Sequence, residues 1–302
     1  MTIDEVIAGV PAWAGIDVQV EPIEGGLTNT NYRLTVSGDA RYCVRIPGAD
    51  SSLLAIDREV EWRNTVAAAA SGAGAGVAYV VGDIPVMVLE WIEGRPQTGE
   101  MLRNDDAVPL MAAACRRLHD GPAFVNEFDM FRIQEGYLRL IRERGFRIPA
   151  TYEEHLPTVE RIKAAMAVRA APRVPCNNDL LAANYIDVGG AFRIIDYEYS
   201  GMNDPCFELG NTWAESELSD DQLALLCERY FGEHLANRVA RARLWSIMSN
   251  YGWTLWAAIQ QAVSDIDFDF WEWGIDGKFA RAEAALADPG FGRLLDDVQR
   301  AD

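Results

Sequence analysis

Three side chains that carry oxygen ligands stand near one another in the sequence, at Asp179, Asn184 and Asp196. Carboxylate and amide oxygens offered in ones and twos leave room for water and phosphate oxygens, which suits Mg²⁺ better than a cage made only of protein. If Asn184 and Asp196 bind Mg²⁺, Asp179 is left to accept a proton from a hydroxyl group, as the catalytic-loop aspartate does in phosphoryl transfer. The three residues therefore predict Mg²⁺-dependent phosphoryl transfer. The alternative is an ordinary hairpin whose turn residues are solvated.

A predicted hairpin brings two of these residues together. The runs 185–188 and 191–195 are rich in β-forming residues, and Gly189-Gly190 between them can take the positive φ angles of a two-residue turn. Counting back from the turn pairs Val188 with Ala191, Ile186 with Arg193, and Asn184 with Ile195. Asp196 then lies beside Asn184, with Asp179 in the polar loop before the hairpin. The pattern D-x-x-x-x-N, hairpin, Asp resembles the catalytic and metal-binding segments of the protein-kinase-like fold.

A turn-rich loop at residues 24–31 separates two predicted strands near the N-terminus. Glycine lets backbone N–H groups approach phosphates, and threonine and asparagine side chains can donate as well. The candidate nucleotide ligands here are Gly26, Leu27, Thr28 and Asn29. A simple hairpin turn also explains the glycine pair.

The strand predicted over residues 41–47 sends Arg41, Cys43 and Arg45 to one face. Arg45 can hold nucleotide phosphates through its bidentate fork, or it can be an exposed strand arginine. The helix predicted to open at residues 56–62 carries Glu59 and Glu61 about 200° apart, so only one of them can face the strand. We expect Glu59 to pair with Arg45, with surface charge as the alternative for Glu59.

The boundary between two lobes is predicted at residues 93–94, because Glu93-Gly94-Arg95-Pro96 interrupts the pattern after the hairpin formed by 77–81 and 86–92. This gives an N-terminal nucleotide-binding lobe, residues 1–93, and a C-terminal catalytic and substrate-binding lobe, residues 94–302. In a kinase-like fold Glu90 to Ile92 runs along the adenine and hydrogen-bonds it through backbone groups.

An aromatic cluster is predicted in the C-terminal third. In the helix near 241–263, Trp253 and Trp256 fall opposite the apolar stripe, and acids alternate with aromatic residues over 265–273. Aromatic faces with carboxylates nearby bind quaternary ammonium groups, at roughly 0.5–2 kcal/mol for each good contact. Plain core packing is the alternative. Glu208, Asn211 and Glu215 recur at helical spacing, as an exposed polar face or as one side of a cleft.

Composition describes an ordinary globular protein, with 302 residues, 49% hydrophobic and 24% charged. The net charge of -19 argues against nucleic acid and favours a cationic small molecule. The five cysteines are odd in number and lack a C-x-x-C pair, so we expect reduced, packed thiols. No apolar run reaches the length of a membrane span, and the first residues are acidic where a secretory signal is basic, so a cytoplasmic protein is expected.

Together these segments resemble the choline/ethanolamine kinase family, in the aminoglycoside-phosphotransferase-like branch of the protein-kinase-like fold. The matching motifs lie at 25–32, 43–48, 57–59, 178–184, 195–200, 208–211 and 253–260. The resemblance implies an α+β bilobal fold, with a small N-terminal lobe of antiparallel sheet plus one helix and a larger, mostly helical C-terminal lobe.

The resemblance also implies roles. Asp179 would be the general base, Asn184 and Asp196 the Mg²⁺ ligands, Glu198 a helper at the metal, and Arg45 a phosphate clamp held by Glu59. The choline pocket would be lined by Glu215, Trp253, Trp256, Phe268 and Trp273. The implied reaction converts ATP and choline to ADP and phosphocholine. A kinase for ethanolamine or an aminoglycoside, or a catalytically dead binding protein, stays open, as does the oligomeric state.

Two positions depart from the family pattern. Asn177 stands where the family usually has a histidine that ties the catalytic loop to neighbouring backbone, and an asparagine could partly replace it. Leu181 stands where some members have a polar residue that contacts substrate, which leaves the choice of amino alcohol open.

Overall fold

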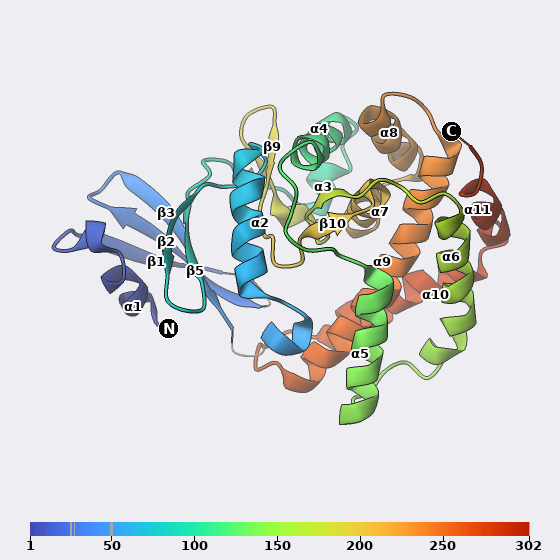
Figure 1. Ribbon diagram of the computed structural model, residues 1–302, viewed down its shortest axis with the longest axis horizontal. Coiled ribbons are helices and arrows are strands. Elements are labelled where there is room, and N and C mark those ends of the chain that lie inside the picture. Colours follow the sequence, from blue (N-terminus) through green and yellow to red (C-terminus); the bar gives the residue numbers. More distant parts are fainter. Residues whose placement is uncertain (25, 27, 49–50, 302) are drawn as a thin grey trace.

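The computed structural model describes residues 1–24, 26, 28–48 and 51–301. In this part of the chain an antiparallel five-stranded sheet forms one end of the molecule and helices form the other (Figure 1). The sheet has the order β1-β2-β3-β5-β4, with bounds Val18–Ile23, Asn29–Val36, Ala40–Pro47, Val86–Glu90 and Val77–Val81 in that order. The N-terminus lies beside this sheet, and the C-terminus lies at the far end of the helical part (Figure 1).

Helix α1 (Ile3–Ala8) and the 3-10 turn η1 (Pro11–Trp13) cover one face of the sheet. Thr2 begins α1 with a capping box, in which its hydroxyl and the Glu5 carboxylate each accept a backbone N–H of the other residue. Val6, Val10 and Trp13 pack against strand residues such as Leu34 and Val44 to form a small core. The N-terminal lobe therefore has an apolar core of its own.

Helix α2 (Arg58–Ala70) lies between the sheet and the helical part (Figure 1). Asp57 caps it by accepting the N–H groups of Glu59 and Val60, so the helix expected to open at Ile56 begins two residues later. The short turn η2 (Ser51–Leu54) precedes it. Ala68 of α2 belongs to the large core of the helical lobe, and α2 therefore joins the two parts.

The helical lobe is built around α9 (Ala236–Val263), which is buried on nearly every side. A helix that is apolar all round belongs in the interior, where other elements surround it. The elements packed against it include α5 (Met130–Arg144), α6 (Leu156–Val168), α7 (Pro205–Ser216), α8 (Asp220–Phe231), η5 (Trp271–Phe279), α10 (Ala280–Ala287) and α11 (Phe291–Asp297). The lobe also contains α3 (Gly99–Leu102), α4 (Ala107–His119) and η3 (Tyr152–His155).

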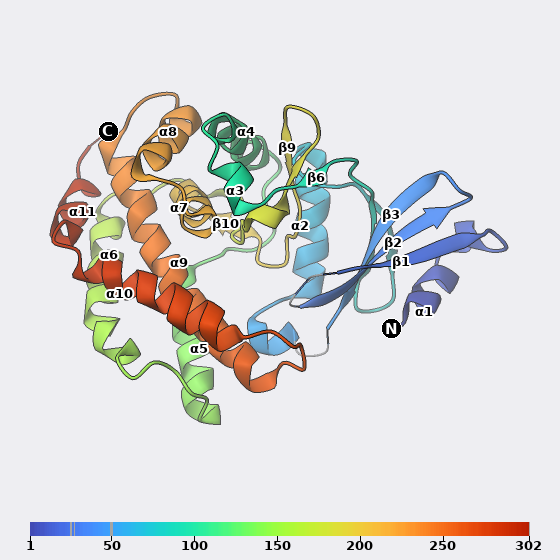
Figure 2. The same cartoon turned by 180° about the vertical axis from the view of Figure 1, so that it is seen from behind.

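Two small sheets flank the residues predicted to be catalytic. One has the order β6-β8-β9, with bounds Arg95–Pro96, Tyr185–Asp187 and Phe192–Ile194, and the other pairs β10 (Gly201–Asn203) with β7 (Val174–Cys176). Figure 2 shows β6 and β9 on the side of the helical lobe that faces the large sheet. The turn η4 (Ala182–Asn184) leads into β8.

The predicted hairpin register is confirmed. Ile186 pairs with Arg193, the Val188 N–H donates to the Ala191 oxygen, and the Ile195 N–H donates to the Asn184 oxygen. Gly189 and Gly190 have φ angles of 89° and 91°, as the two-residue turn requires.

The predicted α+β bilobal fold is also confirmed, with an antiparallel sheet and one long helix beside it in the small lobe. All five cysteines are free, and four of them are buried. Within the described ranges, none of the helices combines the length and the apolar character needed to cross a bilayer.

Candidate active site

A cavity of about 460 Å³ lies between the large sheet and the helical lobe. Its walls come from both parts of the chain, with Arg45 of β3 and Glu90 of β5 on one side and the catalytic loop, which we define as residues 177–184, on the other. Most of the predicted site residues line it, namely Gly26, Thr28, Arg45, Glu90, Ile92, Asp179, Asn184, Asp196, Glu198, Trp253, Trp256 and Trp273. Leu27 lies outside the described residues.

Polar side chains of α7 hold the catalytic loop by accepting hydrogen bonds from its backbone N–H groups. Glu208 is fully buried, and its two carboxylate oxygens accept the N–H groups of Asn177 and Asn178, each at 2.8 Å. Asn211 accepts the Leu180 N–H at 2.8 Å. The polar row on α7 that begins at Glu208 therefore supports the loop rather than facing solvent.

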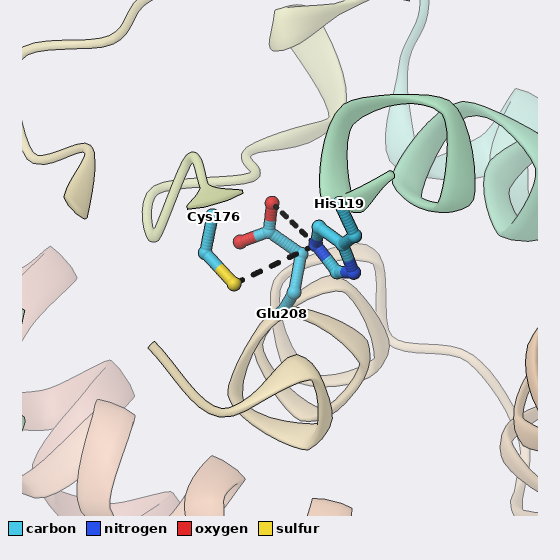
Figure 3. Close-up of side chains that lie close together, drawn as sticks. All are labelled: His119, Cys176 and Glu208. Carbon is cyan, nitrogen blue, oxygen red and sulfur yellow. Dashed lines mark hydrogen bonds and ion pairs between the residues drawn. The ribbon is translucent and has the colours of Figure 1, made fainter. Parts of the chain in front are cut away.

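His119, Cys176 and Glu208 form a buried cluster under this loop (Figure 3). His119 Nε2 lies 3.5 Å from the Cys176 sulfur and 3.6 Å from a Glu208 oxygen, and its Nδ1 lies 2.7 Å from the Tyr230 hydroxyl. Histidine, cysteine and glutamate can ligate metals, but both Glu208 oxygens already accept loop N–H groups. We therefore interpret the cluster as packing that fixes the loop.

Asn184 and Asp196 offer oxygen atoms to the cavity. Asn184 Nδ2 donates to the main-chain oxygen of Asp179 at 2.7 Å, so the amide oxygen is the atom left to bind a cation. Asp196 has φ 68°, a left-handed conformation that aspartate tolerates better than most residues. One of its oxygens accepts Arg45 Nη2 at 2.6 Å, and a second oxygen remains. A carboxylate and an amide oxygen at one cavity wall fit Mg²⁺.

Negative charge is concentrated around Asp179. Burial raises the pKa of Asp179 well above its ordinary value, and the carboxylates of Asp196, Glu198 and Glu215 raise it further, while Lys278 lowers it. Burial likewise raises the pKa of Glu198 to about 7, with Asp196 adding to the shift and Arg45 opposing it. Burial and the neighbouring carboxylates therefore favour the neutral form of these two carboxyl groups.

The predicted pairing of Arg45 with Glu59 is wrong. Arg45 Nη2 lies 3.7 Å from Glu61 Oε1, and both side chains are buried. Glu59 lies on the exposed side of α2, where it accepts Arg63 Nη2 at 2.6 Å. Helical geometry places the two acids on different sides of α2, and the side that faces β3 carries Glu61. Arg45 Nε is buried and has no hydrogen-bond partner among the described residues.

The loop at residues 24–31 is tied to the helical lobe through Glu198. The Thr28 hydroxyl lies 2.8 and 2.9 Å from the two Glu198 oxygens, and Asn29 Nδ2 donates to Glu198 Oε2 at 2.9 Å. Arg58 Nη1 also donates to Glu198, at 3.3 Å. Gly26 lines the cavity with φ 99°, so its backbone is open to a ligand without an intervening side chain.

The segment Glu90 to Ile92 lines the cavity on the same side as Arg45. The Glu90 N–H donates to Gly76 at 2.8 Å, and the Trp91 N–H donates to Arg41 at 3.2 Å. The Ile92 N–H has no acceptor in the described part of the chain. Cys43, Leu89 and Ile195 add apolar surface here, as a flat heterocycle requires.

Three indoles and a phenol form the far wall. Trp256 Nε1 donates to the Tyr199 hydroxyl at 2.7 Å, and the rings of Tyr199 and Trp253 lie 4.8 Å apart. The ring centroids of Trp273 and Trp256 lie 5.7 Å apart in an edge-to-face arrangement. Phe268 does not line the cavity, because it is 38% exposed and packs against Trp273 from outside.

Sequence reasoning missed Lys278, which lines the cavity and forms an ion pair with Glu215. Glu215 itself is buried behind this lysine and is not part of the cavity lining. A signal existed, because Lys278 is the first lysine or arginine after Arg243, in a stretch rich in acids and aromatic residues. Tyr199 and Glu61 were also missed as members of the site.

The fold and this site define a protein-kinase-like phosphotransferase. The chain belongs to the phosphotransferase enzyme family, which matches residues 19–245. The solved structure of a choline/ethanolamine kinase family protein from Mesorhizobium loti has a TM-score of 0.85 and 31% identity, with 99% of each chain covered.

Two further relatives are 26% identical. Ethanolamine kinase 2 of Rattus norvegicus matches over 88% of this chain and 76% of its own, and protein LicA of Haemophilus influenzae over 78% and 72%. The chain is thus a choline/ethanolamine kinase-type enzyme, a small-molecule phosphotransferase with an alcohol group as acceptor.

Proposed function

We propose that the enzyme transfers the γ-phosphoryl group of ATP to the hydroxyl of choline, giving phosphocholine. The observation that carries the proposal is one cavity lined by Asp179, by the oxygen-bearing side chains of Asn184 and Asp196, and by a wall of indoles. A proton acceptor, a site for Mg²⁺ and a surface for an alkylammonium group are thereby within reach of one small ligand.

The nucleotide takes the side of the cavity formed by the N-terminal lobe, which we assign to residues 1–93. The unpartnered Ile92 N–H and the carbonyl of Glu90 suit the adenine edge. Arg45 is the phosphate clamp, since an unpaired buried N–H costs about 1–3 kcal/mol and a phosphate oxygen would satisfy Arg45 Nε. Gly26, Thr28 and Asn29 would contact the phosphates, and Leu27, which is predicted to do the same, lies outside the described residues.

Asn184 and Asp196 would hold Mg²⁺, with Glu198 beside them. The ion, when bound, neutralises charge that develops on the phosphate oxygens. Glu198 already fixes Thr28 and Asn29, so the same carboxylate positions the phosphate loop relative to the metal ligands.

Asp179 acts as the general base in residues 94–302, the catalytic and substrate-binding lobe. Its raised pKa makes it a better proton acceptor than an ordinary aspartate once it is ionised. Asn177 is not part of the cavity lining but holds the loop, because its amide donates to the Ile195 and Asp196 oxygens. The loop geometry therefore supports an active enzyme rather than a dead relative.

Choline is the substrate that the indole wall favours. Trp253, Trp256 and Trp273 present aromatic surface to a group that has no N–H to donate, with Glu215 and Phe268 behind them. Ethanolamine is the second candidate, because the relatives include an ethanolamine kinase as similar in sequence as protein LicA.

The test is ADP release from Mg²⁺-ATP with choline, ethanolamine, the methylated ethanolamines and an aminoglycoside. We expect the highest kcat/KM with choline, loss of turnover in Asp179→Asn, and full activity in Asp83→Asn, a matched change at an exposed turn. Turnover of another alcohol alone would contradict choline as the substrate but would support phosphoryl transfer to an alcohol. Undiminished turnover in Asp179→Asn would contradict the assignment of Asp179 as the general base.

A further inference from the structure

The ammonium group of Lys278 lies buried at the inner end of the aromatic wall. Lys278 is 1% exposed, its Nζ lies 4.3 Å from the centroid of the Trp273 ring, and it forms an ion pair with Glu215. The Glu215 side chain is 6% exposed. We call the Trp273 ring and the Glu215 carboxylate together the ammonium position.

An aromatic face with a carboxylate beside it is the chemistry by which proteins recognise alkylammonium ligands. Lys278 lines the same cavity as Asp179, Trp253 and Trp256, so the ammonium position belongs to the substrate side of the active site. The chain's own cation thus fills the position that a substrate cation would take.

The local backbone explains why these two side chains meet. Trp273 and Lys278 are five residues apart, which on an α-helix separates them by about 140°. The segment Trp271–Phe279 is wound instead as a π-helix, whose i to i+5 repeat places Lys278 over Trp273. Gly274 seats this segment against Ala257 of α9, where a Cβ atom would overlap the alanine. The winding is therefore fixed by packing.

We propose that Lys278 is a specificity-determining residue that removes selection for positive charge at the ammonium position. Its charge neutralises Glu215 and repels a second cation, while the indoles still accept an apolar group of the right shape. The alcohol is then chosen by shape and apolar contact more than by charge. This inference rests on the proposed function, because it specifies the substrate class of the same site.

The first experiment compares choline with 3,3-dimethylbutan-1-ol, its uncharged isostere, by ADP release. We expect the wild-type kcat/KM values to agree within about threefold, and Lys278→Met to raise the choline-to-isostere ratio about tenfold or more. Methionine keeps an unbranched apolar chain over Trp273 but carries no charge. A wild-type ratio above about tenfold, or a ratio unchanged in Lys278→Met, would overturn the proposal.

The second experiment measures binding of tetramethylammonium through tryptophan fluorescence and needs no turnover. We expect the Kd to fall about tenfold or more in Lys278→Met and to stay unchanged in Lys278→Arg, which keeps the charge. Glu215→Gln added to Lys278→Met should abolish the gain, and this double variant leaves no unpaired buried carboxylate if the single variant folds poorly. An unchanged Kd in Lys278→Met contradicts the proposal, even if neither alcohol is phosphorylated and the proposed function itself fails.

Discussion

The side-chain amide of Asn177 joins the catalytic loop to the main chain at Asp196. Asn177 Nδ2 donates to the Asp196 oxygen at 2.6 Å and to the Ile195 oxygen at 3.1 Å. Its own oxygen accepts the Asp179 N–H at 3.0 Å. One buried amide therefore joins Asp179, the proposed general base, to Asp196, a proposed metal ligand, which is the structural task that the resemblance assigns to a histidine.

Truncation of this amide should impair catalysis more than substrate binding. In Asn177→Ala the loop loses three hydrogen bonds, and a displacement of about 1 Å at the reacting groups can cost about 100-fold in rate. We expect kcat to fall by about that factor, and Asn177→His to retain most of the activity. Equal kcat values for Asn177→Ala and the wild type would show that the amide does not position Asp179.

The two glutamates of α2 provide a matched pair for testing Arg45. Glu61→Gln removes a buried negative charge 3.7 Å from Arg45 Nη2, whereas Glu59→Gln only breaks an exposed ion pair with Arg63. We expect KM for ATP to rise about fivefold or more in Glu61→Gln, since Arg45 loses one of the groups that orient it. Glu59→Gln should leave KM for ATP unchanged, because exposed ion pairs contribute little. A higher KM for ATP in Glu59→Gln with no change in Glu61→Gln would instead support the pairing of Arg45 with Glu59.

The fall in kcat/KM at low pH should reflect protonation of Asp179. Its pKa in the free enzyme is raised, so lowering the pH through that value protonates the general base and removes the proton acceptor. We expect log kcat/KM to fall with unit slope below an inflection that lies above the ordinary aspartate value of about 3.9. An inflection at or below the ordinary value would show that burial and the neighbouring carboxylates do not raise the pKa of Asp179.

Local patterns predicted much of the site. Asn184 and Asp196 could be paired on paper because a two-residue turn fixes the register of the strands beside it. Helix α2 could not be oriented in the same way, since its sequence Arg-Glu-Val-Glu-Trp-Arg-Asn-Thr followed by five apolar residues marks no single apolar face. The choice between Glu59 and Glu61 therefore depended on tertiary packing.

Contacts between segments far apart in the chain could not be predicted from the sequence, for a related reason. Thr28 and Glu198 are 170 residues apart, and Glu215 and Lys278 are 63 residues apart. No periodicity relates such pairs. The first is brought together where the two lobes meet, and the second by the packing of α7 and the π-helical segment against α9. The π-helix itself was unpredictable from the 3.6-residue period that identifies ordinary helices.

Neutralising Asp179 should stabilise the fold while it abolishes turnover. A carboxyl whose folded-state pKa is raised favours folding at low pH, and this contribution is lost as the pH rises through the folded-state pKa. At pH 8, well above the pKa of an aspartate in the unfolded chain, Asp179 therefore opposes folding. Asp179→Asn should unfold at a higher temperature than the wild type, with the difference vanishing toward pH 4. A lower Tm for Asp179→Asn near pH 8 would contradict the direction of the shift.

Glu208 should behave in the opposite way, although it is also a buried carboxylate. Its two oxygens each accept a loop N–H at 2.8 Å, so its charge is satisfied by hydrogen bonds, whereas the charge of Asp179 faces other carboxylates. Glu208→Gln replaces one acceptor with a donor and should cost about 1.5–3 kcal/mol of unfolding free energy. Urea unfolding measures this as a lower midpoint with an unchanged slope.

The control for Glu208 is Glu228→Gln, an equivalent change at an exposed position of α8 that should leave the midpoint within error. The loop supported by Glu208 also carries Asp179, so kcat of Glu208→Gln should fall together with stability. Full stability and full kcat in Glu208→Gln would mean that Asn177 and Asn211 hold the loop without it. Opposite signs for Asp179→Asn and Glu208→Gln would show that hydrogen bonding, rather than burial, decides which carboxylate the fold requires and which one it tolerates for catalysis.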